Sequence, residues 1–151
     1  MLRLARHLWA GPNTILGSCV GLGVLLLGGH MRIVMGVMEF EGGVLKRAQQ
    51  LLPASLRFGA ITLGHVIIGI DWRTLNRVRL HEHVHVRQYE RWGMFFLPAY
   101  LLSSLWQLCR GRRMYRDNVF EREAYEFERV CDEARLSRAA AMSRLEDGQS
   151  Q

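Results

Sequence analysis

Residues 58–70 read FGAITLGHVIIGI, and residues 76–92 read NRVRLHEHVHVRQYERW. The first stretch is rich in branched side chains and is punctuated by glycines, which is typical of a buried β-strand. The second stretch predicts a long helix that is closed by Gly93. A strong strand followed at once by a long polar helix indicates a domain that mixes α and β structure, and we expect these two elements to form its centre.

Shorter elements precede this strand. Residues 31–40 are rich in β-favouring side chains and are followed by paired glycines, so they predict one or two short strands. Residues 44–52 carry apolar side chains at helical spacing, and Pro53 ends that helix. The sequence shows no internal repeat and no low-complexity linker. We therefore expect a single domain.

A last long helix is expected near the C-terminus. Asn118 with Glu121 three residues later is a capping-box pattern, and the helix should run to about Leu145. Residues 147–151 should form a frayed tail. The predicted fold class is thus α+β, with the domain spanning residues 31–146 and built from a short β-sheet, the central helix and this glutamate-bearing helix.

The first 30 residues are dominated by an apolar, uncharged run at residues 15–29. This run is shorter than the roughly 20 residues that a membrane span needs, although extending it back to Trp9 reaches that length. Arg3 and Arg6 precede it, as in a signal peptide, but no good cleavage site follows. We expect residues 1–30 to form either an apolar anchor or a buried helix.

An anchor would associate the protein with a membrane through residues 13–29. The expected localisation is then at a membrane, and the alternative is a cytoplasmic protein in which a glycine-rich helix is buried. The long apolar run thus leaves two readings of the N-terminal segment open.

Composition excludes several classes of protein. The chain has 151 residues, of which 49% are apolar and 23% are charged, so it is neither disordered nor a bundle of many membrane spans. Its net charge is +6, from 20 basic and 14 acidic residues. Because the arginines alternate with glutamates on the predicted helices, the pattern favours a solvated, ion-paired surface, and no nucleic-acid partner is expected.

The three cysteines stand far apart in the sequence, and no C-x-x-C pair is present. This spacing argues against a cysteine zinc site and against a disulfide framework. We expect all three to be small, buried apolar residues.

Residues 81–85 read HEHVH and contain the pattern H-E-x-x-H. On a helix, residues four apart share a face, so His81 and His85 can hold one metal ion together. Glu82 lies about 100° further round the helix, where its carboxylate can reach a water on the metal. The spacing predicts two ligands and a general base, Glu82, with Zn²⁺ as the expected cofactor.

A catalytic zinc ion usually has three protein ligands, and residues 121–125 read EREAY. In this arrangement the chain resembles the zincin metallopeptidases, specifically the gluzincin branch, in which a downstream helix supplies a glutamate in the pattern E-x-x-[AS]-[DN]. Glu121 and Ala124 match that pattern. Tyr125 departs from it, because the family has Asp or Asn there to support a histidine ligand.

The resemblance covers the organisation of residues 61–127. It implies that Glu121 is the third zinc ligand, and that a strand beside the motif helix holds an extended peptide substrate, a role that falls to residues 58–70. Glu123 is the alternative third ligand, because helix geometry places it nearer the apolar face of the last helix. In that case Glu121 serves only as the capping-box carboxylate. Two further acidic candidates lie on the same helix, Glu126 and Glu128.

A second apolar run, residues 94–109, lies between the two halves of the predicted metal site. If it crossed a bilayer, the histidines and Glu121 would lie on opposite sides. The run is also short and contains Pro98. We therefore expect it to pack on the domain or to lie at a membrane surface.

These observations predict a zinc-dependent metallopeptidase or related hydrolase that acts on a peptide or protein substrate. The alternative is a non-catalytic protein, either membrane-associated or a scaffold, with a structural or vestigial metal site. Because so short a chain leaves little room for a substrate cleft, this alternative has a physical basis of its own.

Overall fold

The computed structural model describes residues 9–51, 53 and 58–149, and it describes side chains as far as residue 142. The prediction about Arg3 and Arg6 therefore lies outside the described residues. Five α-helices, a 3₁₀ turn and four strands are described. In chain order they are α2 (Gly11–Leu26), β1 (Gly29–Val34), β2 (Val37–Gly42), α3 (Leu45–Gln50), β3 (Ala60–Leu63), β4 (Val66–Gly69), α4 (Trp72–Trp92), η2 (Gly93–Phe95), α5 (Phe96–Cys109) and α6 (Val119–Gln149).

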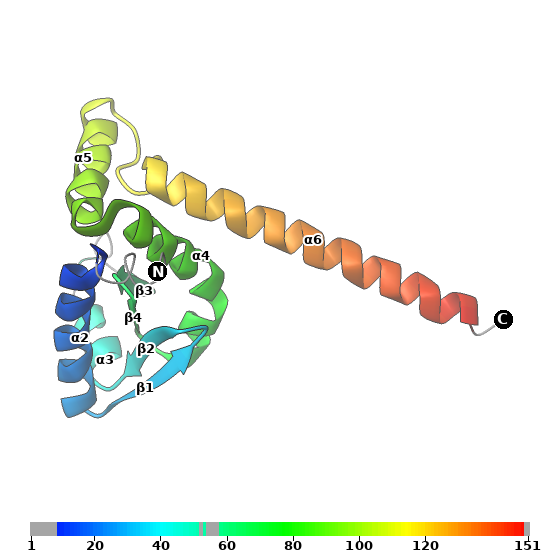
Figure 1. The fold of residues 1–151 in the computed structure, drawn as a ribbon, viewed down its shortest axis with the longest axis horizontal. Helices are drawn as coiled ribbons and strands as arrows, with labels where there is room; N and C mark the ends of the chain where they lie inside the picture. The colour runs from blue at the N-terminus through cyan, green and yellow to red at the C-terminus, as the bar shows by residue number, and fades with distance from the viewer. Residues whose placement is uncertain (1–8, 52, 54–57, 150–151) are drawn as a thin grey trace.

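The strands form one sheet in the order β1-β2-β4-β3. β2 and β4 pair in parallel, whereas the two outer pairs are antiparallel. Helix α2 covers one face of the sheet, and α4 covers the other (Figure 1). The predicted α+β fold class is confirmed at this level.

Central strand β4 explains why residues 58–70 carry such a strong apolar signal. Val66 and Ile68 pack with Val24 of α2, whereas Ile67 faces the other way and packs with Leu75 of α4. All four residues of β4 are buried. A strand covered on both faces reads as a continuous apolar run and loses the alternation of a half-buried strand.

The prediction of one strand over residues 58–70 is wrong, because the segment folds into the hairpin of β3 and β4. Gly64 occupies the turn with a φ of 62°, a conformation that glycine adopts without steric cost. A uniformly apolar run hides such a reversal. Residues 31–40 form part of a second hairpin, β1–β2, which turns at Met35 and Gly36 and confirms the two-strand reading.

Helix α2 lies very close to the sheet because its inner face is lined by glycines. A Cβ atom built on Gly17 would lie 2.8 Å from the backbone oxygen of Leu63, and one on Gly21 would lie 2.5 Å from the ring of Phe40. Glycine is therefore required at both positions for this approach. The glycine-rich composition of the N-terminal run thus has a packing cause.

Helix α4 begins four residues earlier than predicted. Asp71 is its N-cap, and its carboxylate accepts a hydrogen bond from the backbone N–H of Thr74 at 2.8 Å. The hydrogen bond lowers the pKa of Asp71, which is the direction expected for a carboxylate at a helix N-terminus. The helix ends at Trp92, and Gly93 follows as predicted.

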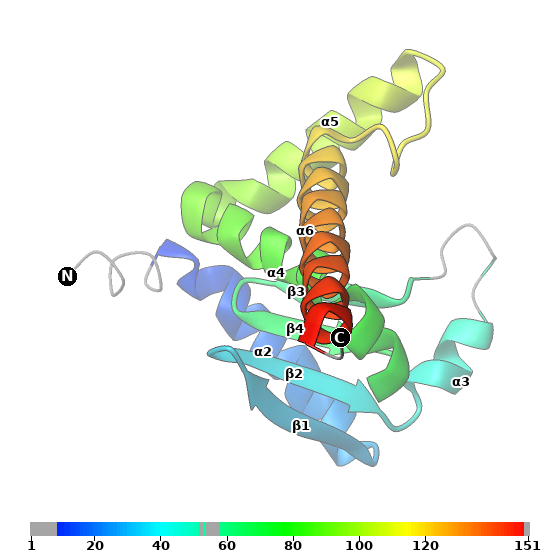
Figure 2. The same ribbon diagram turned by 90° about the vertical axis from the view of Figure 1, so that its right-hand side faces the viewer.

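The last helix extends further than predicted. α6 begins at Val119, runs to Gln149 and so includes residues expected to be frayed. It projects away from the rest of the domain, and α4 and α5 pack only beside its first turns (Figures 1 and 2). A small core of Tyr89, Phe96 and Phe120 joins these three helices. This core fixes the start of α6 against α4.

Among the described residues, no helix is both long and apolar enough to cross a bilayer. The N-terminal apolar run forms a helix of 16 residues, α2, and the chain then enters strand β1. The prediction that the cysteines are buried is wrong, since Cys19 and Cys109 are exposed and Cys131 is partly exposed.

Candidate metal centre

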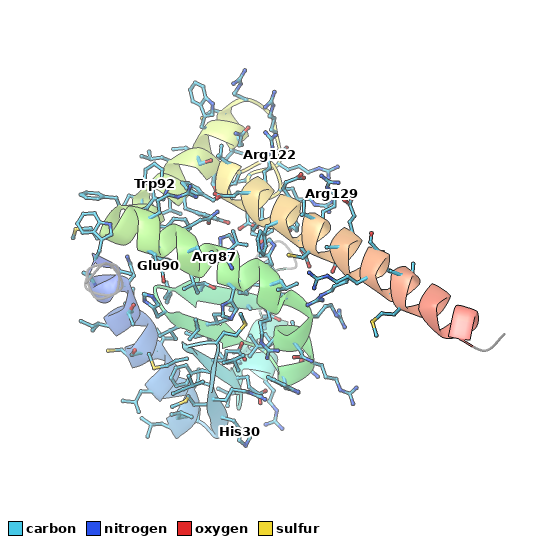
Figure 3. All side chains as sticks on the ribbon, turned by 45° about the vertical axis from the view of Figure 1, so that its right-hand side comes forward. His30, Arg87, Glu90, Trp92, Arg122 and Arg129 are labelled. Carbon is cyan, nitrogen blue, oxygen red and sulfur yellow. The ribbon has the colours of Figure 1, made fainter. Side chains whose placement is uncertain are left out.

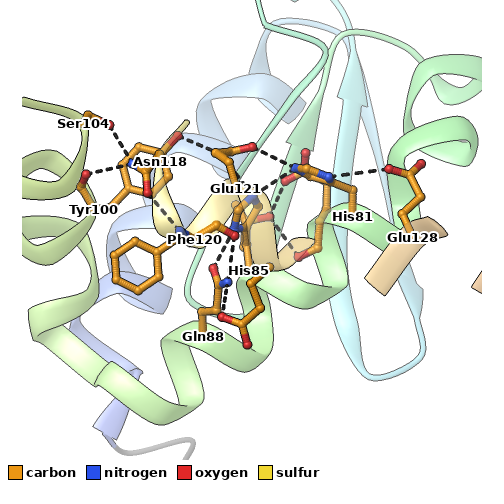
Figure 4. A network of polar contacts seen from close by, with 12 residues as sticks. His81, His85, Gln88, Tyr100, Ser104, Asn118, Phe120, Glu121 and Glu128 are labelled. Atoms are coloured by element: carbon orange, nitrogen blue, oxygen red, sulfur yellow. Dashed lines mark hydrogen bonds and ion pairs between the residues drawn. The ribbon is translucent and has the colours of Figure 1, made fainter. Parts of the chain in front are cut away.

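The two histidines of the H-E-x-x-H motif lie one turn apart on the inner face of α4. Their Nε2 atoms are 3.2 Å apart, and both side chains are buried. Each histidine also faces the first turn of α6. The spacing of the motif therefore places both histidines on one face of the helix, as helix geometry predicts. Their Nε2 atoms point toward the same place (Figure 4).

Glu121, in the first turn of α6, completes the group. Its carboxylate oxygens lie 3.1 Å from Nε2 of His81 and 3.3 Å from Nε2 of His85. One ligand atom from each residue lies within 4.8 Å of the other two. Ligands about 2.0–2.1 Å from a tetrahedral zinc ion stand about 3.3 Å from one another. The observed separations of 3.1–3.3 Å thus match the spacing that one metal ion requires.

Glu121 stays ionised although its side chain is buried. Burial opposes its ionisation, but hydrogen bonds with His81 and His85 outweigh burial and hold the pKa at about 2. The side chain is 1% exposed. A buried carboxylate needs compensating partners, and two imidazoles with a cation between them would supply them. The donor set can hold a metal ion.

Glu82 lies on α4 beside this group and is buried. Its Oε2 accepts a hydrogen bond of 2.6 Å from the hydroxyl of Thr62 on β3. Burial raises the pKa of Glu82, while the charge of His85 and the bond from Thr62 act against that rise. A carboxyl group with a raised pKa is suited to exchanging protons near neutral pH.

Each imidazole has a polar neighbour at its other nitrogen. Nδ1 of His85 lies 2.8 Å from Oε1 of Gln88, whose amide also donates to the backbone oxygen of Phe120 at 3.0 Å. Nδ1 of His81 lies 3.7 Å from Oε2 of Glu128. The short contact with Gln88 orients the ring of His85 and leaves its Nε2 free to act as a ligand, whereas Glu128 lies only at ion-pair distance from His81.

At position 125, where the chain departs from the gluzincin pattern, a tyrosine lies beside a metal-site histidine. Tyr125 packs its ring against that of His81, with centroids 4.7 Å apart. The carboxylate that faces the ring nitrogen of His81 comes instead from Glu128, one turn later on α6. Support for the histidine is thus present at a different position of the helix.

Tyr100 and Asn118 tie α5 to the same group (Figure 4). The hydroxyl of Tyr100 donates to Oε1 of Glu121 at 2.7 Å. Burial and the neighbouring charge of Glu121 raise the pKa of Tyr100, which keeps the phenol protonated as a donor. The amide of Asn118 donates to the hydroxyl of Ser104 at 2.7 Å, and its Oδ1 accepts from the backbone N–H of Phe120.

Asn118 therefore caps α6 as expected, but the capping-box role considered for Glu121 is wrong. Its carboxylate faces the histidines and Tyr100 instead. The alternative ligand Glu123 lies apart from the cluster and binds Gln88 at 2.9 Å and Arg91 at 2.6 Å. Glu126 pairs with Arg129 on the outer side of α6. Of the glutamates considered, Glu121 is the one whose carboxylate lies beside the Nε2 atoms of both histidines.

Comparison with known proteins gives no match, since no protein-family model, curated protein or solved structure shows significant similarity to the chain. Interpretation of the site therefore rests on its geometry and chemistry.

Four supporting residues were not anticipated from the sequence: Thr62, Gln88, Tyr100 and Glu128 as an ion-pair partner of His81. Gln88 follows His85 by three residues and so lies on the same helical face, a local signal that was available. Thr62 and Tyr100 reach the cluster through the tertiary fold, and the sequence carries no local mark of their role.

Proposed function

We propose that the protein is a zinc-dependent metallopeptidase or closely related hydrolase. The observation that carries the proposal is the convergence of His81, His85 and Glu121 at mutual distances of 3.1–3.3 Å, with buried Glu82 beside them. Two imidazoles and a carboxylate are a donor set that zinc prefers, and three protein ligands leave a position for a small molecule. Zn²⁺, when bound, activates water for attack and polarises a carbonyl group.

Glu82 is the residue that would move the proton. As the oxygen of water forms its bond to the peptide carbonyl carbon, the carboxylate of Glu82 takes a proton from that water. The same carboxyl group then delivers the proton to the leaving amine as the C–N bond breaks. Thr62 donates to Oε2 of Glu82 and would hold the carboxylate in place.

Strand β3 supplies a place for the substrate backbone. It is the outermost strand of the sheet on this side, and Thr62 within it contacts Glu82 directly. An extended peptide that added to the edge of β3, which pairs with no other strand among the described residues, would pass beside the general base. This arrangement supports a peptide substrate, as the resemblance to zincins implies.

Burial of the three ligands favours a second function, a structural metal site in a non-catalytic protein. His81, His85 and Glu121 are only 5%, 7% and 1% exposed. Structural zinc sites are closed, whereas catalytic ones keep an open position. In this second function the metal would fasten α6 to α4, and Glu82 would have no chemical task.

Glu82→Gln separates the two functions. The protein is purified with Zn²⁺, its metal content is measured by mass spectrometry, and hydrolysis of fluorescently labelled casein is followed. If the protein is a peptidase, Glu82→Gln keeps its zinc and loses at least about 100-fold in rate, because the general base is gone.

Glu90→Gln, on the same helix, is the matched control and should retain both metal and activity. Full zinc content without hydrolysis in the wild type supports the structural site. The variant His81→Ala/His85→Ala should lose the metal, and retention of stoichiometric zinc by it would refute both functions.

A further inference from the structure

Helices α2 and α5 form a second feature of the molecule, separate from the metal cluster. Figure 1 shows them along one side of the domain, with α6 extending away from that side. In Figure 2, where α6 points toward the viewer, α2 lies behind the sheet and α5 lies above it, both on the side away from the viewer. The two views agree that α2 and α5 share one flank, which we call the α2–α5 flank.

Each of the two helices buries one large apolar side chain and exposes many. The inner face of α2 carries Asn13, Gly17, Gly21 and Val24, and that of α5 carries Phe96, Ser104 and Gln107. Large apolar side chains point outward, and several are about half exposed or more: Ile15, Leu22, Leu26, Leu101, Leu102, Leu105, Trp106 and Leu108. In water, a helix turns its apolar face to the core, so this arrangement indicates an apolar medium outside.

Acidic residues are missing from the same part of the sequence that forms the flank. Residues 9–38 and 92–116, which contain both helices, include no aspartate or glutamate, although the chain has 14 acidic residues. Four arginines follow α5 in the turn that leads to α6: Arg110, Arg112, Arg113 and Arg116. Each of them is exposed. The flank therefore joins an apolar surface to a turn with four arginines and a single acidic residue, Asp117, at its end.

Tryptophans lie at the margins of the flank. Trp9 precedes α2, Trp92 ends α4 next to η2, and Trp106 is in the last turns of α5, with 45%, 43% and 60% of their surfaces exposed. In Figure 3, Trp92 lies on the side that carries α2, whereas Arg129 lies on α6 at the other side. Exposed tryptophans are typical of the level of lipid headgroups.

We propose that the α2–α5 flank is a monotopic docking surface for an anionic lipid bilayer. Both helices would lie in the plane of the interface, with their outer leucines among the upper acyl chains and the basic turn after α5 among anionic headgroups. This proposal does not rest on the proposed peptidase function, since it concerns residues outside the metal cluster.

The lengths of α2 and α5 and the charge of the flank favour the surface of an anionic bilayer over a membrane span or a second copy of the chain. At 16 and 14 residues, α2 and α5 are each shorter than the roughly 20 residues of a span, and the inner face of each packs on protein. A second copy would have to bring an identical acid-free surface with its own four arginines against this one, which is electrostatically unfavourable. Anionic lipid offers both an apolar layer and the opposite charge.

Vesicle flotation tests the proposal with the full-length protein. Vesicles of phosphatidylcholine with about 30% phosphatidylglycerol should carry the protein upward, and phosphatidylcholine alone should bind it at least about fivefold less. Leu102→Asp/Leu105→Asp should weaken binding to the mixed vesicles by more than about tenfold, because two apolar contacts are replaced by charges. Arg112→Gln/Arg113→Gln should reduce only the part of the vesicle binding that depends on phosphatidylglycerol.

Matched controls lie on α6. Leu136→Asp changes a leucine that is 72% exposed, and Arg135→Gln/Arg138→Gln removes two exposed arginines. Both should float like the wild type. Thermal unfolding of every variant verifies that the fold is kept.

Three results would overturn the proposal. One is no flotation by a folded wild-type protein. A second is equal weakening by Leu136→Asp, which would show that any exposed leucine is sufficient. The third is a wild-type dimer in solution that Leu102→Asp/Leu105→Asp converts to a monomer while vesicle binding is absent, which would assign the flank to a second copy. Zinc content and hydrolysis are separate readouts, so failure here leaves the proposed function to its own test.

Discussion

The α4–α6 side of the molecule and the α2–α5 flank differ in which side chains they bury and which they expose. Around α4 and the start of α6, charged groups are buried and joined to one another, as in the contacts of Glu121 with His81 and Tyr100. On the α2–α5 flank, most of the large apolar side chains are exposed, and the buried face is shared by two apolar residues, Val24 and Phe96, with glycine and polar residues such as Gly17 and Ser104.

Each arrangement is unfavourable for an isolated domain in water. Buried charges lose hydration, and exposed apolar surface stays in contact with water. Each becomes favourable with one component that the chain does not supply, a cation for the first region and an apolar layer for the second. Where buried charges or exposed apolar side chains depart from the usual pattern of burial, their chemistry therefore indicates what would contact them.

Loss of the third ligand should change zinc affinity more than any other substitution. Glu121→Gln should lower zinc affinity by more than about 100-fold, because it removes the negative ligand and leaves only the two imidazoles. Glu123→Gln, two residues away on the same helix, should change affinity by less than about threefold. Competition with a chromophoric chelator measures both. Equal losses would mean that the cluster depends on the general acidity of α6 rather than on one carboxylate.

Gln88 should show how much the orientation of His85 contributes. Gln88→Met removes the acceptor for Nδ1 and should weaken zinc binding by about 10–100-fold. Gln88→Glu keeps an acceptor at that position but loses the donors to Phe120 and Glu123. It should therefore lose thermal stability while keeping zinc affinity within about threefold of wild type. If both variants lost affinity alike, the link to α6 and not the orientation of the ring would be the cause.

On the other side of the sheet, alanine substitutions on α2 should have opposite signs. Gly17→Ala should reduce the free energy of unfolding by about 1–3 kcal/mol, because the new methyl group meets the backbone of Leu63. Gly23→Ala should raise it by about 0.5–1 kcal/mol, because no atom lies within 4 Å of that position and alanine favours helix. Urea denaturation measures both. Stabilisation by Gly17→Ala would contradict the close packing of α2.

The smallest effect is expected at the cap of α4. Asp71→Ala should cost about 1 kcal/mol at neutral pH. Because the pKa of Asp71 is lowered in the folded state, its charge contributes stability above its unfolded pKa of about 3.9. That contribution is lost as pH falls through the folded value.

The Asp71 prediction has its own control. The variant Asp71→Asn keeps a capping oxygen without a titrating charge, so its stability should not share this acid-dependent loss. Thermal unfolding at a series of pH values gives the comparison. A wild type and an Asp71→Asn variant with identical pH profiles would show that the charge contributes nothing.

Local spacing was sufficient to predict part of the molecule. The positions of His81 and His85 on one face follow from helix periodicity alone, and the cap at Asn118 follows from its side chain. The preference for Glu121 over Glu123 comes only from a family pattern, because helix angles alone cannot choose between the two residues. The decisive information, which turn of α6 meets α4, is tertiary.

The remaining differences also have physical causes. The β3–β4 hairpin was missed because β4 is buried on both faces, which removes the alternation that would have shown where residues 58–70 turn back. The cysteines were expected inside because small apolar side chains usually are, but Cys19 and Cys109 lie in helices whose large side chains face outward. Sequence patterns report the polarity of a residue and not the medium that surrounds its helix.

One consequence of α6 concerns mechanics. Glu121 lies in the first turn of a helix of 31 residues, so about 42 Å of helix separates it from Gln149 at 1.5 Å per residue. Because the helix is this long, a rotation of about 10° about its first turn moves its far end by about 7 Å. The direction in which Glu121 approaches the two imidazoles is thereby coupled to whatever holds or displaces the distant tip of the helix.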